Sequence, residues 1–364
     1  MNVVKNQFDI TRRTLGVTFS ADQKAHVTIW APQTKHVALA INDESVYLPL
    51  TADNSGYWHL DTDQLKPGDT YAFILDDDKK YADPASLTQP QGVNGSSQAV
   101  DTSKFYWEDS CWVNPPLDEY TLFELNIQTF SLEGTVDAVI KKLGKLKKLG
   151  INALLIKQIS SSPESTSDFF PYALQAGFGG PYQLHHLINI CHFDGIAVVL
   201  DVNYTEMGKQ NDYATCRHAD DREADRDESN FAHDAHREAK RRHIIDNALM
   251  WFRDFHVDVL RLNAVHTLPD SDQILNDIRT YTNQLTAVTG IHHCLLVDDE
   301  RANKSLTGET AIEQERKIDP NSITDQYNGY CSDYQASKLP IKTYREDYLY
   351  DEHFSSTLRE LVGR

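Results

Sequence analysis

The chain has 364 residues, of which 40% are hydrophobic and 24% charged, so it can bury a sizeable core as one large domain or two ordinary ones. Acidic residues outnumber basic residues by 54 to 35, which gives a net charge of -19. A charge of this sign disfavours long-range attraction to nucleic acid or to an anionic membrane. It leaves a neutral ligand unaffected.

The first residues, "MNVVKNQFDITRRT", lack the apolar stretch of a signal peptide, and no later run approaches the roughly 18 apolar residues of a membrane-spanning helix. We therefore expect a cytoplasmic protein. The cysteines are scattered and form no CxxC pair, so we expect reduced thiols, no disulfide framework, no zinc site and no cofactor. They are Cys111, Cys191, Cys216, Cys294 and Cys331.

Residues 17–105 contain short alternating stretches such as "AHVTIWAP" and "HVALAI", which are separated by turn residues in "TADNSG" and "LKPGDT". This pattern is typical of antiparallel strands, and we predict a β-sandwich over residues 1–110. Trp30 and Trp58 fit the core of such a sandwich better than an exposed sugar platform.

From Tyr120 onward, apolar strands alternate with amphipathic helices, as in parallel βα units. After the strand "LFELNIQTF", Thr135 can cap a helix whose apolar stripe runs from Val136 to Leu149, and Gly150 closes it. Residues 111–364 are thus predicted to form a TIM-type barrel of about six βα units, in which chemistry gathers where strands end. The other expected strands are "INALLIK", "IAVVLDVNY", "VDVLRLNAV", "HHCLLVDD" and a weak sixth, "SITDQYN".

We predict an exposed, partly helical insertion over residues 206–243, because residues 217–243 are dense in charge and poor in apolar residues. His233 and His236 lie one helical turn apart with Asp234 nearby. No complete ligand set accompanies them, so a solvated charged face is favoured over a metal site.

Several segments together resemble the maltooligosyltrehalose trehalohydrolases of the α-amylase family, glycoside hydrolase family 13. They include "YADPASLTQPQGVNGSSQAV", "LFELNIQTFSLEGTVDAVIKKLGKLKKLGINAL", "GFGGP" and "IIDNALMWFRDFHVDVLRL". "VTIWAP" and "GYWHLDTDQLKPGDTYAFIL" resemble the family's N-terminal sandwich, which is akin to carbohydrate-binding module family 48. The resemblance runs from about residue 15 to about residue 360.

The resemblance implies a retaining glycosidase that releases trehalose from the end of an α-glucan. That chemistry needs two carboxyl groups about 5 to 5.5 Å apart, one a nucleophile and the other a general acid. In the fourth-strand motif Arg261 and Leu262 match the family, but Asn263 occupies the position of the nucleophilic Asp. An amide is uncharged and a poor nucleophile, so a glycosyl-enzyme intermediate should not form at a useful rate.

The fifth-strand motif also departs from the family. Asp298 occupies the position of the general acid Glu, and its shorter side chain would hold the proton about an ångström from the intended oxygen. Asp299 or Glu300 could compensate only from different faces of the strand.

The substrate-binding positions differ as well. The third-strand motif keeps Asp201 and Tyr204 but has Glu206 where the family has His, and His266 stands at its usual place. The segment "STSDF" stands where the family has the aromatic residues that lie under the reacting sugar. The later segment "DQYNGYCSDYQ" corresponds to a motif that supplies a carboxylate in the family, and it has no matching carboxylate unless Asp333 reaches the site. Of the family's core catalytic set, Arg261 alone is intact.

The family's barrel continues beyond the point where this sequence ends, so the resemblance implies an incomplete barrel with exposed edges. Closure by other residues, closure by a second subunit, and a fragmentary sequence are the open alternatives.

Three functional hypotheses follow. The first is a pseudoenzyme with the trehalohydrolase scaffold, which binds an α-glucan, a maltooligosaccharide or a protein partner. The second is a working glycosidase that uses relocated carboxylates such as Glu206 and Asp298. The third is an interaction protein without sugar binding, which docks partners through its charged insertion.

Overall fold

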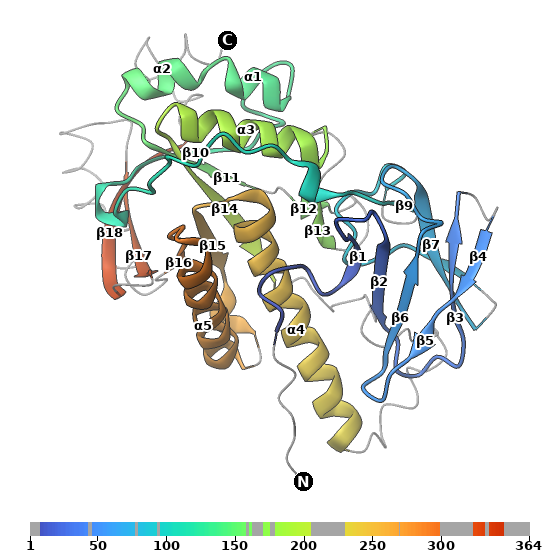
Figure 1. The fold of residues 1–364 in the computed structure, drawn as a ribbon. Coiled ribbons are helices and arrows are strands. Elements are labelled where there is room, and N and C mark those ends of the chain that lie inside the picture. Colours follow the sequence, from blue (N-terminus) through green and yellow to red (C-terminus); the bar gives the residue numbers. More distant parts are fainter. Residues whose placement is uncertain are drawn as a thin grey trace. The chain divides into compact units, whose positions relative to one another are not determined.

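The computed structural model describes residues 8–42, 46–76, 79–92, 95–157, 160–161, 170–174, 179–204, 230–268, 270–298, 323–331 and 335–345 (Figure 1). The chain divides into two compact units. The first comprises Met1–Lys104, Ser160–Ala176 and Thr205–Met250, and the second comprises Phe105–Ile159, Gly177–Tyr204 and Trp251–Arg364. The predicted domains are continuous in sequence, whereas each unit gathers segments from several parts of the chain.

The first unit contains two antiparallel sheets, as the alternating sequence predicts. Their orders are β1-β2-β6-β5 and β4-β3-β7-β8, with β9 paired to β7. The strands are β1 Gly16–Phe19, β2 Ala25–Trp30, β3 Val37–Ile41, β4 Val46–Pro49, β5 Thr51–Ala52, β6 Tyr57–Thr62, β7 Thr70–Leu75, β8 Lys79–Tyr81 and β9 Ser97–Gln98.

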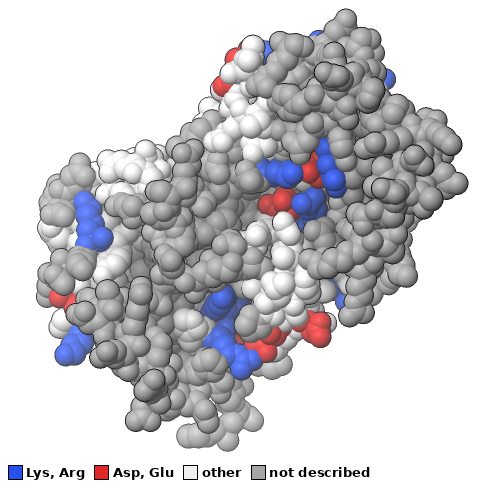
Figure 2. Space-filling model, turned by 180° about the vertical axis from the view of Figure 1, so that it is seen from behind, with Lys and Arg blue, Asp and Glu red and all other residues white. Residues whose placement is uncertain are grey.

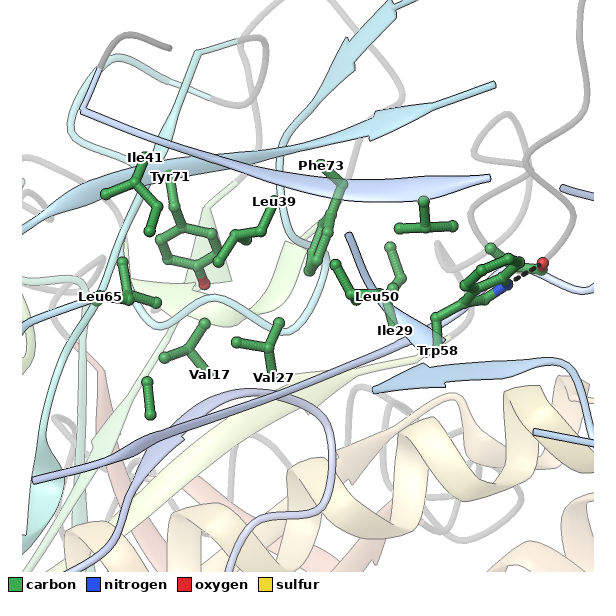
Figure 3. Close-up of a cluster of buried hydrophobic side chains, with 14 of the residues drawn as sticks. Val17, Val27, Ile29, Leu39, Ile41, Leu50, Trp58, Leu65, Tyr71 and Phe73 are labelled. Atoms are coloured by element: carbon green, nitrogen blue, oxygen red, sulfur yellow. Dashed lines mark hydrogen bonds between the residues drawn. The ribbon is translucent and has the colours of Figure 1, made fainter. Parts of the chain in front are cut away.

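The core of the sandwich is built by alternate residues of these strands. In β2, Ala25, Val27 and Ile29 are buried while the residues between them are half-buried, the period of two expected of a strand with one buried face. Val27 of one sheet and Phe73 of the other point toward one another in the space between the two sheets (Figure 3). Trp58 belongs to this cluster, so its predicted place in the core is confirmed.

Two later segments complete the first unit. The hairpin of β12 (Ser160–Ser161) and β13 (Phe170–Leu174) is one of them. The other is most of α4 (Asn230–Phe255), which begins within the predicted charged insertion. Ala239 is buried there and residues 240–243 are half-buried, so this part of the insertion is less exposed than predicted. Residues 206–229 lie outside the described residues.

The second unit is a closed barrel of seven strands, β10-β11-β14-β15-β16-β17-β18. Neighbours from β10 to β16 are parallel. The strands are β10 Thr121–Leu125, β11 Ala153–Ile156, β14 Ala197–Asn203, β15 Val259–Asn263, β16 Cys294–Asp298, β17 Ile323–Tyr330 and β18 Gln335–Arg345.

Of the alternatives for the barrel, the structure shows closure by other residues of the chain, because a hairpin closes the sheet. β17 runs antiparallel to both β16 and β18, and β18 pairs in parallel with β10. The predicted sixth strand therefore exists, but it runs antiparallel to β16 and forms a hairpin with β18. No second subunit is needed to cover an edge between β16 and β10.

Helices accompany the parallel strands, and α1, α2 and α3 lie together on one side of them (Figure 1). The helix predicted after β10 is in fact two short helices, although its apolar stripe is buried at Val136, Val139, Leu143 and Leu146 as expected. The side chain of Thr135 caps the first of them. The helices are α1 Val136–Ile140, α2 Leu143–Lys148, α3 Pro181–Phe193 and α5 Ser271–Thr289, with short 3-10 turns at η1 Thr102–Lys104, η2 Leu117–Glu119 and η6 Val265–Thr267.

The cysteine prediction is wrong for one pair. Cys294 and Cys331 form a disulfide, which joins the start of β16 to the residue that follows β17. Cys111 and Cys191 are free thiols, the first exposed and the second buried. Cys216 lies outside the described residues. Among those residues, no helix has both the length and the apolar character needed to cross a membrane.

Candidate functional site

Arg261 is the middle residue of β15 and is buried inside the barrel, with 9% of its surface exposed. The register of the sheet places it beside Asp201 of β14, and its Nε donates to Asp201 Oδ1 at 2.9 Å. Its Nη1 donates to Glu124 Oε2 at 3.3 Å. Because β10 and β15 are not neighbours in the sheet, this second contact crosses the barrel interior.

Glu124 is the centre of a larger group of charges. Lys157, which directly follows β11, donates from Nζ to Glu124 Oε1 at 2.7 Å. Arg345, the last residue of β18, places Nε 3.4 Å from Glu124 Oε2. We call the set Glu124, Lys157, Asp201, Arg261 and Arg345 the mouth cluster. It gathers at the carboxyl ends of barrel strands, where the catalytic groups of such barrels lie.

The two carboxyl groups of the mouth cluster differ in acidity. Burial alone would raise the pKa of Glu124, but the charges of Arg345, Lys157 and Arg261 outweigh it and lower that pKa. Burial raises the pKa of Asp201 further than Arg261 lowers it, and the negative charge of Glu124 adds to the rise. Three cations thus hold Glu124 as a carboxylate.

Asn263 is the last residue of β15 and is partly exposed. The next residue, Ala264, has a φ of 51°, so the chain turns through the left-handed region before η6. Asp298 is the last residue of the neighbouring strand, β16. Leu262 is paired with Val297, so the next residues, Asn263 and Asp298, end the two strands at the same level. The structure therefore brings the backbones of the nucleophile and acid positions to one edge of the barrel. The side chain of Asp298 lies outside the described part.

The remaining predicted site residues have different surroundings. Tyr204 follows β14 and is buried with 2% of its surface exposed, and its burial raises its pKa. His266 is exposed on η6. Glu206 and Asp333 fall outside the described residues, as does the "STSDF" segment. The structure joins two of the predicted binding residues, Arg261 and Asp201, by a direct hydrogen bond.

Sequence reasoning missed Glu124, Lys157 and Arg345. A signal was present for the first two, because each is a charge at the end of an otherwise apolar strand, in "LFEL" and "ALLIK". Such a charge is costly to bury unless it is paired. Arg345 gave no such signal, because its strand was not predicted.

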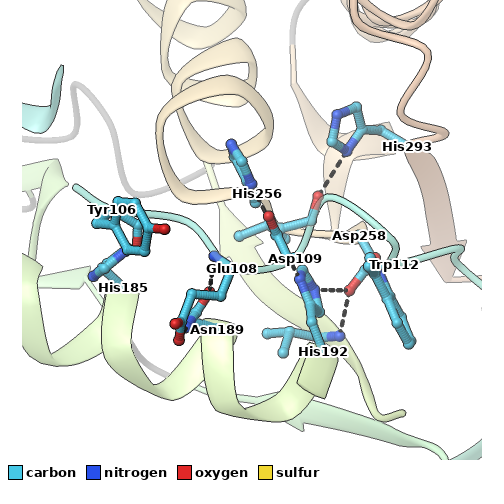
Figure 4. A network of polar contacts seen from close by, with 12 residues as sticks. Tyr106, Glu108, Asp109, Trp112, His185, Asn189, His192, His256, Asp258 and His293 are labelled. Atoms are coloured by element: carbon cyan, nitrogen blue, oxygen red, sulfur yellow. Dashed lines mark hydrogen bonds and ion pairs between the residues drawn. The ribbon is translucent and has the colours of Figure 1, made fainter. Parts of the chain in front are cut away.

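A second polar network lies where β14 and β15 begin (Figure 4). His192 Nδ1 lies 2.8 Å from Asp109 and its Nε2 lies 3.0 Å from Asp258, while the ring stacks on Trp112. Asp258 also accepts hydrogen bonds from the backbone of Val198 and from Trp112. The network is buried at the amino ends of the strands, which indicates a role in stability.

The first unit offers a poorer sugar site. Trp58 is buried and donates from Nε1 to the carbonyl of Ala31 at 2.9 Å. Trp30 contacts Tyr57 in a tilted arrangement and His236 in a T-shaped one. A cavity of about 390 Å³ is lined mostly by charged and hydroxyl side chains, and Phe8 is the one benzene ring among the described residues that line it. Within the described residues, no group of His, Cys, Asp and Glu is placed to hold a metal ion.

Comparisons with known proteins agree on one group. The chain is 32% identical to malto-oligosyltrehalose trehalohydrolase of Saccharolobus solfataricus, over 96% of this chain and 63% of that protein. It is 28% identical to the enzyme of Arthrobacter ramosus, over 92% of this chain and 62% of that one. The chain is a relative of the maltooligosyltrehalose trehalohydrolases. It spans less than two-thirds of the length of these two relatives.

Solved structures show the fold of this trehalohydrolase relative. A putative α-amylase from Salmonella typhimurium superposes with a TM-score of 0.64 at 24% identity, over 75% of this chain and 48% of that one. A GBS pullulanase in complex with maltotetraose superposes with a TM-score of 0.58 at 18% identity, over 79% and 46%. No family model matches the chain. The likeness supports the predicted pairing of antiparallel sheets with a barrel, and in this chain the barrel is closed by seven strands.

Proposed function

We propose that this trehalohydrolase relative binds an α-glucan at the mouth of its barrel and does not hydrolyse it. The observation that carries the proposal is Asn263 at the end of β15, where the resemblance places the nucleophile. Retaining hydrolysis needs a carboxylate there, both to attack the anomeric carbon and to balance its developing positive charge. An amide does neither.

The mouth cluster supports the same conclusion. Its two carboxyl groups are already bound to Arg261, and Glu124 is also paired with Lys157 and Arg345. An oxocarbenium-like transition state is stabilised by negative charge, whereas Lys157 and Arg345 add positive charge close to the strand ends. The surroundings therefore oppose the chemistry that Asn263 has lost.

Glucan binding is proposed from the comparisons. A GBS pullulanase of similar fold is in complex with maltotetraose, and a pullulanase from Anoxybacillus is complexed with maltotriose. Maltotriose and maltotetraose are therefore the first ligands to test. Calorimetry should give measurable heat with each at millimolar concentration, and absence of heat would contradict the proposal.

The hydrolysis half is tested by reversion. The double variant Asn263→Asp with Asp298→Glu returns both carboxylates to the positions that the resemblance assigns, with Asn263→Ala as the matched control. Trehalose release from maltooligosyltrehalose should be absent in the unaltered chain and in the control. Release by the double variant alone would show a pocket that is otherwise intact.

An active hydrolase with relocated carboxylates is the second candidate. One observation favours it, because the pKa of Asp201 is raised and that of Glu124 is lowered, a division that acid–base pairs of glycosidases use. Trehalose release by the unaltered chain that is lost in Asp201→Asn would favour this candidate over the first.

A further inference from the structure

One cluster of buried side chains marks the interior of the barrel. All seven strands contribute to it, and wherever a strand contributes two residues, these are two positions apart. Because successive side chains of a strand point to opposite faces, such residues share the face that lines the barrel. In β14 they are Ala197 and Val199, and in β15 the residue is Val259.

Polar residues occupy the next positions of this inner face. Two residues farther along the two strands lie Asp201 and Arg261, which are bonded to each other at 2.9 Å. Arg261 also reaches Glu124 across the barrel, as an inward side chain should. Two residues farther again lie Asn203 and Asn263, which end β14 and β15. The alternation therefore places both amides on the inner face, one layer closer to the mouth.

The two amides belong to neighbouring positions of the barrel wall. Asn203 and Asn263 are partners in the register of β14 and β15, and neighbouring strands lie about 4.8 Å apart. Both residues are half-buried, so part of each reaches the surface. The chain turns directly after Asn263, where Ala264 has a φ of 51°. We call Asn203 and Asn263 the amide pair.

The chemistry of the amide pair suits hydroxyl groups. Each amide has a carbonyl oxygen that accepts hydrogen bonds and an NH2 group that donates them, whereas a carboxylate only accepts. A sugar hydroxyl both donates and accepts. Two amides on neighbouring strands therefore offer complementary groups to the hydroxyls of a single sugar ring, at no cost of desolvating a charge.

The charges of the described residues also fit a neutral ligand. On the face seen in Figure 2, acidic and basic side chains lie next to one another rather than in broad patches of one sign. One layer below the amide pair, Asp201 and Arg261 are paired with each other. The position of a neutral sugar is then decided by short-range hydrogen bonds, such as those of the amide pair.

We propose that Asn203 is a ligand-contact residue, and that the amide pair holds hydroxyl groups of one sugar ring of a neutral α-glucan. The inference rests on the proposed function, because it places that ring at the same barrel mouth. It adds a residue that the resemblance does not assign, since the binding positions of the third-strand motif are Asp201, Tyr204 and Glu206. It also gives Asn263 a role in binding.

Calorimetry with maltotriose and the full chain tests the contact. Asn203→Ala and Asn203→Leu should each bind about fivefold to tenfold more weakly than the unaltered chain, which corresponds to the loss of one hydrogen bond. Leucine fills a similar space without a polar group, so a loss that both variants share does not come from a cavity. An unchanged affinity in folded Asn203→Leu would overturn the proposal.

Asn152→Ala is the matched control. Asn152 is a half-buried amide directly before β11, at the opposite end of the same barrel. Its side chain accepts from the backbone of Thr121 and donates to the carbonyl of Glu119, so its loss should lower the unfolding midpoint and leave maltotriose affinity unchanged. Equal losses of affinity in the Asn152 and Asn203 variants would indicate a general loosening of the barrel and overturn the proposal.

A double-mutant cycle tests whether the two amides hold one ring. Asn203→Ala and Asn263→Ala are compared with the variant that carries both. When two residues share a contact, the effects of their substitutions are not independent. The double variant should therefore lose less affinity than the product of the two single losses. Losses that multiply would overturn the shared ring.

The same titrations separate this inference from the proposed function. Heat with maltotriose that is unaffected by either Asn203 variant would refute the contact and leave glucan binding in place. Absence of heat with the unaltered chain would refute glucan binding at the mouth, and this inference with it.

Discussion

Arg261 and Asp201 are joined by an ion pair of 2.9 Å between neighbouring strands, β15 and β14. Their side chains are 11% and 12% exposed. The arginine that the resemblance identifies is therefore held by the barrel itself, through Asp201 and through Glu124 on the far side of the barrel.

This pairing predicts a large stability effect. Arg261→Met leaves Asp201 and Glu124 without a shared cation in the barrel interior, and breaking a buried pair from one side costs about 3 to 5 kcal/mol of unfolding free energy. Urea unfolding followed by circular dichroism measures the loss. Arg12→Met is the control, since its pair with Asp9 is 63% and 38% exposed and should contribute less than about 1 kcal/mol. Equal losses in the two variants would contradict the prediction.

His192 predicts a pH dependence. Both ring nitrogens lie within hydrogen-bond distance of a carboxylate, and only the protonated ring has two N–H groups to donate. Burial alone would lower the pKa of His192, but its bonds to Asp109 and Asp258 outweigh burial and raise it to about 9. The stabilisation is fully present below the ordinary pKa of about 6.5 and is lost as the pH rises through 9, by about 1.4 kcal/mol per pH unit.

His293 has the opposite effect on stability. Burial lowers its pKa to about 4, so the folded state resists protonation and stability falls as the pH drops below about 6.5. Together the two histidines predict a stability maximum close to pH 6.5. Denaturation midpoints between pH 5 and pH 9.5 measure it, and His192→Gln should flatten the alkaline side. His36→Gln, at an exposed position, should not. A midpoint in the unaltered chain that does not fall between pH 6.5 and pH 9 would contradict this account.

The disulfide predicts which cysteines react with an alkylating reagent before reduction. Cys294 and Cys331 are 37 residues apart in sequence, and a cross-link of that span stabilises a fold by about 4 kcal/mol through the entropy of the unfolded chain. In the denatured, unreduced protein, these two cysteines should resist alkylation until a reductant is added, whereas Cys111 reacts at once. Peptide mapping by mass spectrometry distinguishes them. Alkylation of Cys294 without reductant would exclude the bridge.

The buried position of Trp58 predicts that its substitution affects stability and leaves sugar binding unchanged. Trp58→Phe removes the donor to the buried carbonyl of Ala31 and should cost about 1 to 3 kcal/mol of unfolding free energy. Because the side chain belongs to the core, maltotriose affinity should not change. A loss of affinity without a loss of stability would place a sugar site in the first unit.

Much of the fold could be predicted from local sequence. Alternation in "AHVTIW" gave the antiparallel strands, and the apolar runs before Asp201 and Asn263 gave parallel barrel strands, because burial on one or both faces leaves a direct pattern. The register that joins Asp201 to Arg261 follows from two such strands lying side by side.

The parts that were missed depend on contacts between distant residues. The hairpin of β17 and β18 is rich in polar residues, so nothing in "ITDQYNGY" indicates that it runs antiparallel to β16. The Cys294–Cys331 bridge has no spacing motif, and His192 and Asp258 are 66 positions apart. Arg345 joins Glu124 only because closure of the barrel places β18 beside β10, a pairing between strands more than 200 residues apart in sequence.

We propose that this barrel lacks the hydrolytic chemistry of the trehalohydrolases that the chain resembles. Trehalose release from maltooligosyltrehalose by the unaltered chain tests it most directly, at a concentration at which a related trehalohydrolase consumes the substrate. We predict no trehalose above the blank, since loss of a nucleophile lowers turnover by at least about ten-thousandfold. Steady trehalose release that scales with the concentration of the unaltered chain would contradict the account.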